Sequence, residues 1–79
     1  MPRLYVNFFN DADVPDEEGQ EFADLGAAKL VAIAGARELM AEHIRAGKAV
    51  TLSHRIEIAD QAGKVLAVLP FRELVTIVP

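Results

Sequence analysis

The sequence predicts an α+β fold in which one long helix packs on one face of a small antiparallel sheet. Three observations predict this fold. Residues 3–9 are rich in aromatic and β-branched side chains, residues 25–46 repeat apolar side chains at helical spacing, and residues 55–69 form two apolar runs around a turn sequence. The 79 residues suffice for a single domain. We therefore expect three to five strands in the order β-(β)-α-β-β-(β), where brackets mark optional strands.

Residues 3–9 (Arg-Leu-Tyr-Val-Asn-Phe-Phe) are expected to form the first strand. Successive side chains of a strand point to opposite faces of its sheet. The set expected to face the core is Leu4, Val6 and Phe8, and the set on the other face is Tyr5, Asn7 and Phe9.

Residues 10–19 (Asn-Asp-Ala-Asp-Val-Pro-Asp-Glu-Glu-Gly) have the composition of a polar loop. Pro15 and Asp16 suit the central positions of a type I turn, and Gly19 suits a position with positive φ. Residues 20–22 could add a short second strand.

The same loop concentrates negative charge on Asp11, Asp13, Asp16, Glu17, Glu18 and Glu21. Carboxylate oxygens are the ligands that Ca²⁺ and Mg²⁺ prefer, so the candidate metal ligands are Asp11, Asp13, Asp16 and Glu18. An EF-hand loop starting at Asp11 would have Asp16 where Gly is required and Phe22 where Glu is required, so that template fails. A hydrated turn explains the charge more simply, and docking of a basic partner is the second alternative.

The long helix is expected to span residues 25–46. Asp24 is a suitable N-cap, and Gly47 suits the C′ position that ends a helix. At about 100° per residue, the stripe expected to face the sheet comprises Leu25, Ala28, Ala32, Ala36, Leu39, Met40 and His43. Leu30 and Val31 lie off this stripe on opposite flanks, which makes them candidates for an intermolecular contact.

A hairpin is expected around residues 60–63. Asp at the first position and Gly at the fourth are typical of a type I turn closed by a left-handed bulge residue. A three-residue loop between Asp60 and Lys64 fixes the register. The expected pairs are Ile58 with Leu66 and Ile56 with Val68 on the apolar face, and Glu57 with Ala67 and Arg55 with Leu69 on a half-apolar outer face.

Pro70 has no N–H to donate, so the last hairpin strand is expected to end or bulge there. Leu69, on the half-apolar face, is a third candidate for an intermolecular contact. Residues 71–78 leave two alternatives open. Pro-Phe-Arg-Glu-Leu could form a helical turn, while Leu-Val-Thr-Ile-Val favours a last strand. Of the two we expect the strand, from about Val75.

Several of these segments together resemble a known family. They are the aromatic-rich first strand, Pro-Asp-Glu-Glu-Gly at 15–19, Asp-Leu at 24–25, Ala-Arg-Glu-Leu at 36–39, and Leu-Pro-Phe-Arg at 69–72. The chain resembles a family of short bacterial proteins known only as a domain of unknown function. That resemblance implies no activity and no catalytic residues. Members often carry His near the end of the first strand, where this chain has Asn7, so no role of that His carries over.

Composition excludes several function classes. The chain has no cysteine and two histidines, which argues against disulfides and a structural zinc site. Its net charge of −4 argues against general nucleic-acid binding. The first residues lack the pattern of a signal peptide, and no uncharged stretch is longer than residues 30–36, which are too few to cross a bilayer, so we expect a cytoplasmic protein.

No pattern of catalytic residues is evident, and no cofactor is expected. Ser53 and His54 are adjacent in an expected strand, so their side chains point to opposite faces and cannot form a nucleophile–base pair. His43 and His54 are therefore expected to have structural or surface roles.

Two function classes remain. Because 52% of the residues are hydrophobic in a chain with little interior, we expect a non-catalytic protein-interaction or regulatory module that acts as a homodimer, with an unidentified protein as a further possible partner. The alternative is a nucleic-acid-associated regulator of the small antitoxin-like type. It would require Arg3, Arg55 and Arg72 to converge on one face.

Overall fold

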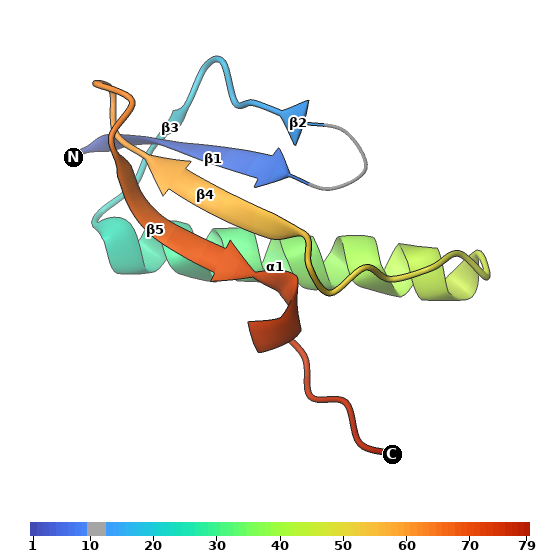
Figure 1. Ribbon diagram of the computed structural model, residues 1–79. Coiled ribbons are helices and arrows are strands. Elements are labelled where there is room, and N and C mark those ends of the chain that lie inside the picture. Colours follow the sequence, from blue (N-terminus) through green and yellow to red (C-terminus); the bar gives the residue numbers. More distant parts are fainter. Residues whose placement is uncertain (10–12) are drawn as a thin grey trace.

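The computed structural model, which describes residues 1–9 and 13–79, has the expected α+β architecture (Figure 1). One long helix lies across one face of a small antiparallel sheet. The elements are β1 (Arg3–Phe9), β2 (Asp13–Val14), β3 (Gln20–Glu21), α1 (Leu25–Arg45), β4 (Arg55–Ala59), β5 (Val65–Pro70) and the 3₁₀ helix η1 (Phe71–Glu73).

The sheet has the order β2-β1-β4-β5, and β3 pairs with β1 on the same side as β2. The end of β1 pairs with β2 through Phe8 and Val14, and its beginning pairs with β3 through Leu4 and Gln20. Together β2 and β3 therefore form one edge strand that is interrupted in the middle. The expected short strand after the loop is confirmed as β3.

Local signals define both ends of α1. The Asp24 side chain accepts a hydrogen bond from the Ala27 N–H at 2.8 Å, which confirms Asp24 as the N-cap. Gly47 adopts φ 71°, as expected for the C′ position, and the last helical residue is Arg45. Among the described residues, α1 and η1 lack the combination of length and apolarity that a bilayer-spanning helix needs.

The core lies between α1 and the sheet, and the helix contributes mostly alanine to it. Ala28, Ala32, Ala36 and Met40 are buried on the helix side. Small side chains allow close approach of the helix to the sheet, where Ile56 and Ile58 are 0% exposed. Full burial of one such side chain contributes roughly 1.5–3 kcal/mol, so these two isoleucines are major determinants of stability. The core-facing set predicted for the first strand is also confirmed, because Leu4 is buried and Val6 and Phe8 pack against the core.

The predicted register of the hairpin is wrong by one residue over most of its length. Ala59 pairs with Val65 as the turn geometry requires, but a bulge follows between Ile58 and Ala59. Beyond the bulge the pairs are Ile58 with Ala67, Glu57 with Val68, Ile56 with Leu69 and Arg55 with Pro70. A shift of one residue exchanges the two faces of a strand. Ala67 and Leu69 therefore pack against the core, and Val68 lies on the outer face.

The strand expected from Val75 is also absent. The chain instead forms η1 directly after Pro70, which was the other alternative. Phe71 and Leu74 are both buried, whereas a strand continuing in line with β5 would have directed these two side chains to opposite faces of the sheet. Burial of these two apolar groups thus prevails over the β propensity of the residues that follow.

Candidate functional site

In the described part of the chain no helix packs on the face of the sheet opposite α1, which is the best candidate surface for function. It presents Tyr5, Asn7 and Phe9 from β1, which pair across the strands with Ala59, Glu57 and Arg55 of β4. Val68 of β5 extends it next to Glu57. We call this surface the outer face.

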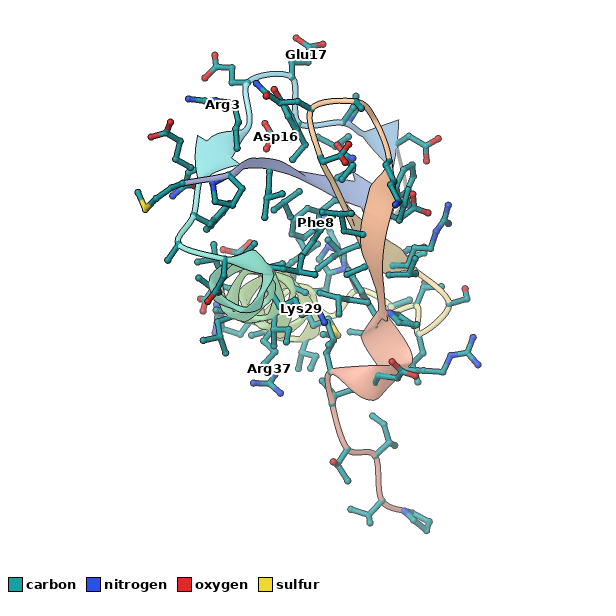
Figure 2. All side chains as sticks on the ribbon, turned by 90° about the vertical axis from the view of Figure 1, so that its left-hand side faces the viewer. Arg3, Phe8, Asp16, Glu17, Lys29 and Arg37 are labelled. Carbon is teal, nitrogen blue, oxygen red and sulfur yellow. The ribbon has the colours of Figure 1, made fainter. Side chains whose placement is uncertain are left out.

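Asp16 fills the gap in the interrupted edge strand. Its Oδ2 accepts a hydrogen bond from the Val6 N–H at 3.3 Å, a group that β2 and β3 leave without a strand partner at this point of the edge. Its Oδ1 accepts from the N–H groups of Glu18 and Gly19 at 3.2 and 3.0 Å. In return, the Asp16 N–H donates to Oδ1 of Asn7 at 2.8 Å. Figure 2 shows Asp16 directed from the loop toward β1, while Glu17 points outward.

The turn at this loop begins at Asp16 and not before it. The expected turn had Pro15 and Asp16 at its centre, whereas the bend falls on Glu17 and Glu18. Asp16 and Gly19 thus take the first and fourth positions, the same pattern that correctly predicted the turn at residues 60–63. This Asp-x-x-Gly spacing is the sequence signal that could have identified the structural role of Asp16.

Gly19 adopts φ 69°, as predicted, and also lies against the Tyr5 ring. A Cβ at this position would lie 2.8 Å from Cε2 of Tyr5, closer than real Cβ atoms approach. The Arg3 guanidinium donates to the Glu18 carbonyl oxygen at 2.9 Å and holds the loop from the other side. Residues 15–19 are therefore held onto β1 by contacts with Arg3, Tyr5 and Asn7.

A hollow of about 320 Å³ opens on the outer face between this loop and the β4–β5 turn. Its polar lining includes Tyr5, Asn7 and the carboxylates of Asp16, Glu57 and Asp60. Each carboxylate already has an internal partner: Asp16 as described, Glu57 with Arg55 Nε at 2.8 Å, and Asp60 with the Ala62 and Lys64 N–H groups, both at 2.9 Å. The contacts of these three carboxylates therefore stabilise the turns and strands that surround the hollow.

The candidate metal ligands are not assembled into a cation site in the described part of the chain. Asp13 is exposed in β2, and Glu18 contributes its backbone carbonyl to Arg3. Asp16 already accepts hydrogen bonds from N–H groups on both carboxylate oxygens, while Asp11 lies outside the described residues. Residues 1–9 and 13–79 contain no group of three or more His, Asp or Glu side chains able to hold a metal ion.

The three candidates for an intermolecular contact have different surroundings. Leu30 and Val31 project from α1 and are 72% and 53% exposed. Leu69 is half-buried and packs against the core, because the bulge turns it toward the helix. The exposed apolar side chains of β5 are instead Val65, Leu66 and Val68.

The arginines that a nucleic-acid surface would need do not converge. Arg3 and Arg55 both belong to the outer face but lie at opposite ends of β1, since Arg55 pairs with Phe9. Six residue-to-residue steps along β1 separate these ends by about 20 Å. The Arg55 guanidinium stacks over the Phe9 ring at 4.4 Å, and Arg72 lies in η1, outside the sheet.

Both histidines have contacts of a structural kind. Nδ1 of His43 lies 3.3 Å from the Ala49 carbonyl oxygen, next to the C-terminal end of α1. The ring of His54 packs edge-on against Phe71, with 5.9 Å between ring centroids. Beyond the bulge Pro70 pairs with Arg55, and the His54 carbonyl oxygen accepts from the Phe71 N–H.

Comparison with known proteins gives one match. The family model described as "Domain of unknown function (DUF6894)" matches residues 3–72, which is most of the chain. No curated protein and no solved structure matches the chain.

Proposed function

The chain belongs to the family of domains of unknown function DUF6894, and on that premise we propose that it is a non-catalytic protein-interaction or regulatory module that acts as a homodimer. The observation that carries the proposal is the apolar surface that the fold leaves uncovered. The helix surface, defined by Leu30 and Val31, and the strand surface, defined by Val65, Leu66 and Val68, are both exposed. Exposed apolar surface on a small domain is typical of a binding site.

The outer face supports a binding role more than a chemical one. Its carboxylates are engaged by arginine or by backbone N–H groups, as described above, and one of them, Asp16, also fills the gap in the edge strand. A nucleophile, a base and a stabilising group must converge for covalent catalysis. The contacts of His43 with Ala49 and of His54 with Phe71 direct both imidazoles to structural partners instead.

Sedimentation equilibrium over a concentration range tests the proposal. We expect the chain to sediment as a dimer at micromolar concentration and to dissociate on dilution. A chain that stays monomeric at several hundred micromolar would contradict the homodimer. If the chain is monomeric, capture of a protein partner from lysates of the native host would support an interaction module that does not self-associate. Failure to capture a partner would favour a function of another class.

A nucleic-acid-associated regulator is the second candidate. The feature that favours it is the stack of Arg55 on Phe9 on the outer face, because aromatic and arginine side chains bind unpaired bases by stacking. The carboxylates of Asp16 and Glu57 on the same face oppose phosphate binding. A mobility shift with generic single-stranded RNA or DNA that weakens with salt would support this candidate, and Phe9→Ala would then abolish the shift.

A further inference from the structure

The two edges of the sheet differ in how they are protected. On one edge, the interruption between β2 and β3 is filled by the Asp16 carboxylate. The other edge is β5, which occupies the end of the strand order in the described part of the chain. Residues 65–70 (Val-Leu-Ala-Val-Leu-Pro) carry no charged side chain, although charged residues are the usual protection of an edge strand.

The backbone of β5 has hydrogen-bonding groups directed away from the sheet. The Phe71 N–H donates to the His54 carbonyl oxygen at 2.8 Å. This bond sets the phase of the antiparallel ladder, in which every second pair of residues is hydrogen-bonded. The pairs of Ile56 with Leu69 and Ile58 with Ala67 follow that alternation. The intervening residue, Val68, therefore points its N–H and C=O outward. Pro70 also occupies an outward position. Because it has no N–H, and an N–H there would not point toward β4, the ladder between β4 and β5 loses no hydrogen bond.

Residues 75–79 provide a segment that can form a strand but has no strand partner in the monomer. They follow η1 and continue beyond the body of the protein in the general direction of β5, as both views show (Figures 1 and 2). Ile77 and Val78 are 70% and 80% exposed. Val-Thr-Ile-Val consists of residue types that favour strands.

This segment cannot fold back onto its own β5 while η1 keeps its position. Phe71 and Leu74 are buried in the core, and Arg37 Nε donates to the Leu74 carbonyl oxygen at 2.8 Å. The Arg72 N–H is bound to the Leu52 carbonyl oxygen at 3.2 Å. These contacts direct residues 75–79 away from the hairpin. The open edge and the strand-forming segment can therefore meet only between two chains.

We propose that residues 75–79 of one copy add as an antiparallel strand to β5 of a second copy, and that the exchange is reciprocal. This inference rests on the proposed homodimer and assigns it to the strand surface. Because β5 and residues 75–79 follow one another in the same general direction, a two-fold axis near η1 places each segment beside its counterpart. Such an interface is closed and isologous, so it yields dimers and not filaments.

The side chains are compatible with this arrangement. Pairing of Val68 with the second copy's Ile77 uses the outward N–H and C=O of Val68 and centres the two-fold axis between residues 72 and 73. Arg72 then lies near the second copy's Glu73, and the two opposite charges repeat across the axis. The paired segments, 65–70 and 75–79, contain no charge that would have to be buried. Because each copy both gives and receives a strand, the buried area is twice that of a single added strand. This brings the area closer to the roughly 800 Å² per partner of a standard interface.

The test compares three variants with the full chain by sedimentation equilibrium, with far-UV circular dichroism as the check of folding. A variant that ends at Leu74 keeps η1 and lacks the exchanged segment. Val68→Lys places a charge on the exposed edge, and Leu30→Lys is the matched control on the helix surface. We expect the first two variants to be folded monomers, with at least a tenfold weaker dimer, and Leu30→Lys to remain dimeric.

Each other outcome has a distinct meaning. If the shortened variant and Val68→Lys dimerise as the full chain does while Leu30→Lys does not, the strand exchange is wrong and the homodimer uses the helix surface. If the full chain itself is monomeric, the proposed homodimer fails together with this inference. Should Val68→Lys not fold, an independent measurement remains: mixing the Val68→Cys and Ile77→Cys variants under oxidising conditions should give a disulfide between the two, which a Leu30→Cys and Ile77→Cys mixture should not.

Discussion

The Asp16 carboxylate accepts a hydrogen bond from the Val6 backbone N–H at 3.3 Å, so that a side chain replaces the strand partner that the interrupted edge does not provide. The same carboxylate also accepts the N–H groups of Glu18 and Gly19. The most acidic segment of the chain is therefore partly a structural element, and several predictions test that role.

Replacement of Asp16 by alanine should lower the free energy of unfolding by about 1–3 kcal/mol, because the N–H of Val6 and those of the turn lose an acceptor. Asp16→Asn should cost less, since an amide oxygen can still accept. Urea denaturation monitored by circular dichroism measures both changes. Glu17→Ala is the matched control, because Glu17 is exposed beside it, and should change stability by less than about 0.5 kcal/mol. Equal effects at Asp16 and Glu17 would contradict the structural role.

Gly19→Ala should destabilise the protein more than Gly63→Ala does. Both glycines have positive φ, so each alanine meets a backbone penalty of roughly 1–2 kcal/mol. At Gly19 the new Cβ would in addition lie 2.8 Å from the Tyr5 ring, whereas at Gly63 nothing lies within 4 Å. Thermal melts of the two variants, recorded side by side, provide the comparison. A Gly19→Ala variant no less stable than Gly63→Ala would mean that the Tyr5 ring moves aside freely.

Ala36→Leu should destabilise the protein by about 1–3 kcal/mol, because Ala36 is 0% exposed between α1 and the sheet and the larger side chain would force them apart. Ala34→Leu, on the exposed side of the same helix, should alter stability by no more than about 0.5 kcal/mol. Chemical denaturation of both variants checks the orientation of the helix. The opposite order of stabilities would require a different helix face in the core.

Addition of Ca²⁺ or Mg²⁺ at millimolar concentration should leave the melting temperature unchanged. Asp16 accepts hydrogen bonds on both carboxylate oxygens, and the described residues contain no cluster of three potential ligands. Calorimetric titration and thermal melts with and without the cation measure this directly. A saturable heat together with a higher melting temperature would instead identify a cation site that includes the acidic loop.

The features that follow from short stretches of sequence were predicted correctly. Asp24 and Gly47 define the helix because capping involves hydrogen bonds within a few residues of each end. The alternation in residues 3–9 identified the core face of β1, and Asp60 with Gly63 identified the hairpin turn. The turn at Asp16 carries the same spacing, so its position was also available from sequence alone.

The tertiary structure alone decided the features that depend on contacts between distant segments. The bulge beside Ile58 and Ala59 sets which side chains of β5 face the core, and a bulge depends on how both strands pack on the helix. The hydrogen bond from Val6 to Asp16 and the burial of Phe71 and Leu74 likewise join residues whose proximity no local pattern specifies. Sequence thus determined the elements and their caps, because their hydrogen bonds are local. Packing determined the register, the end of the sheet and the edge that remains open.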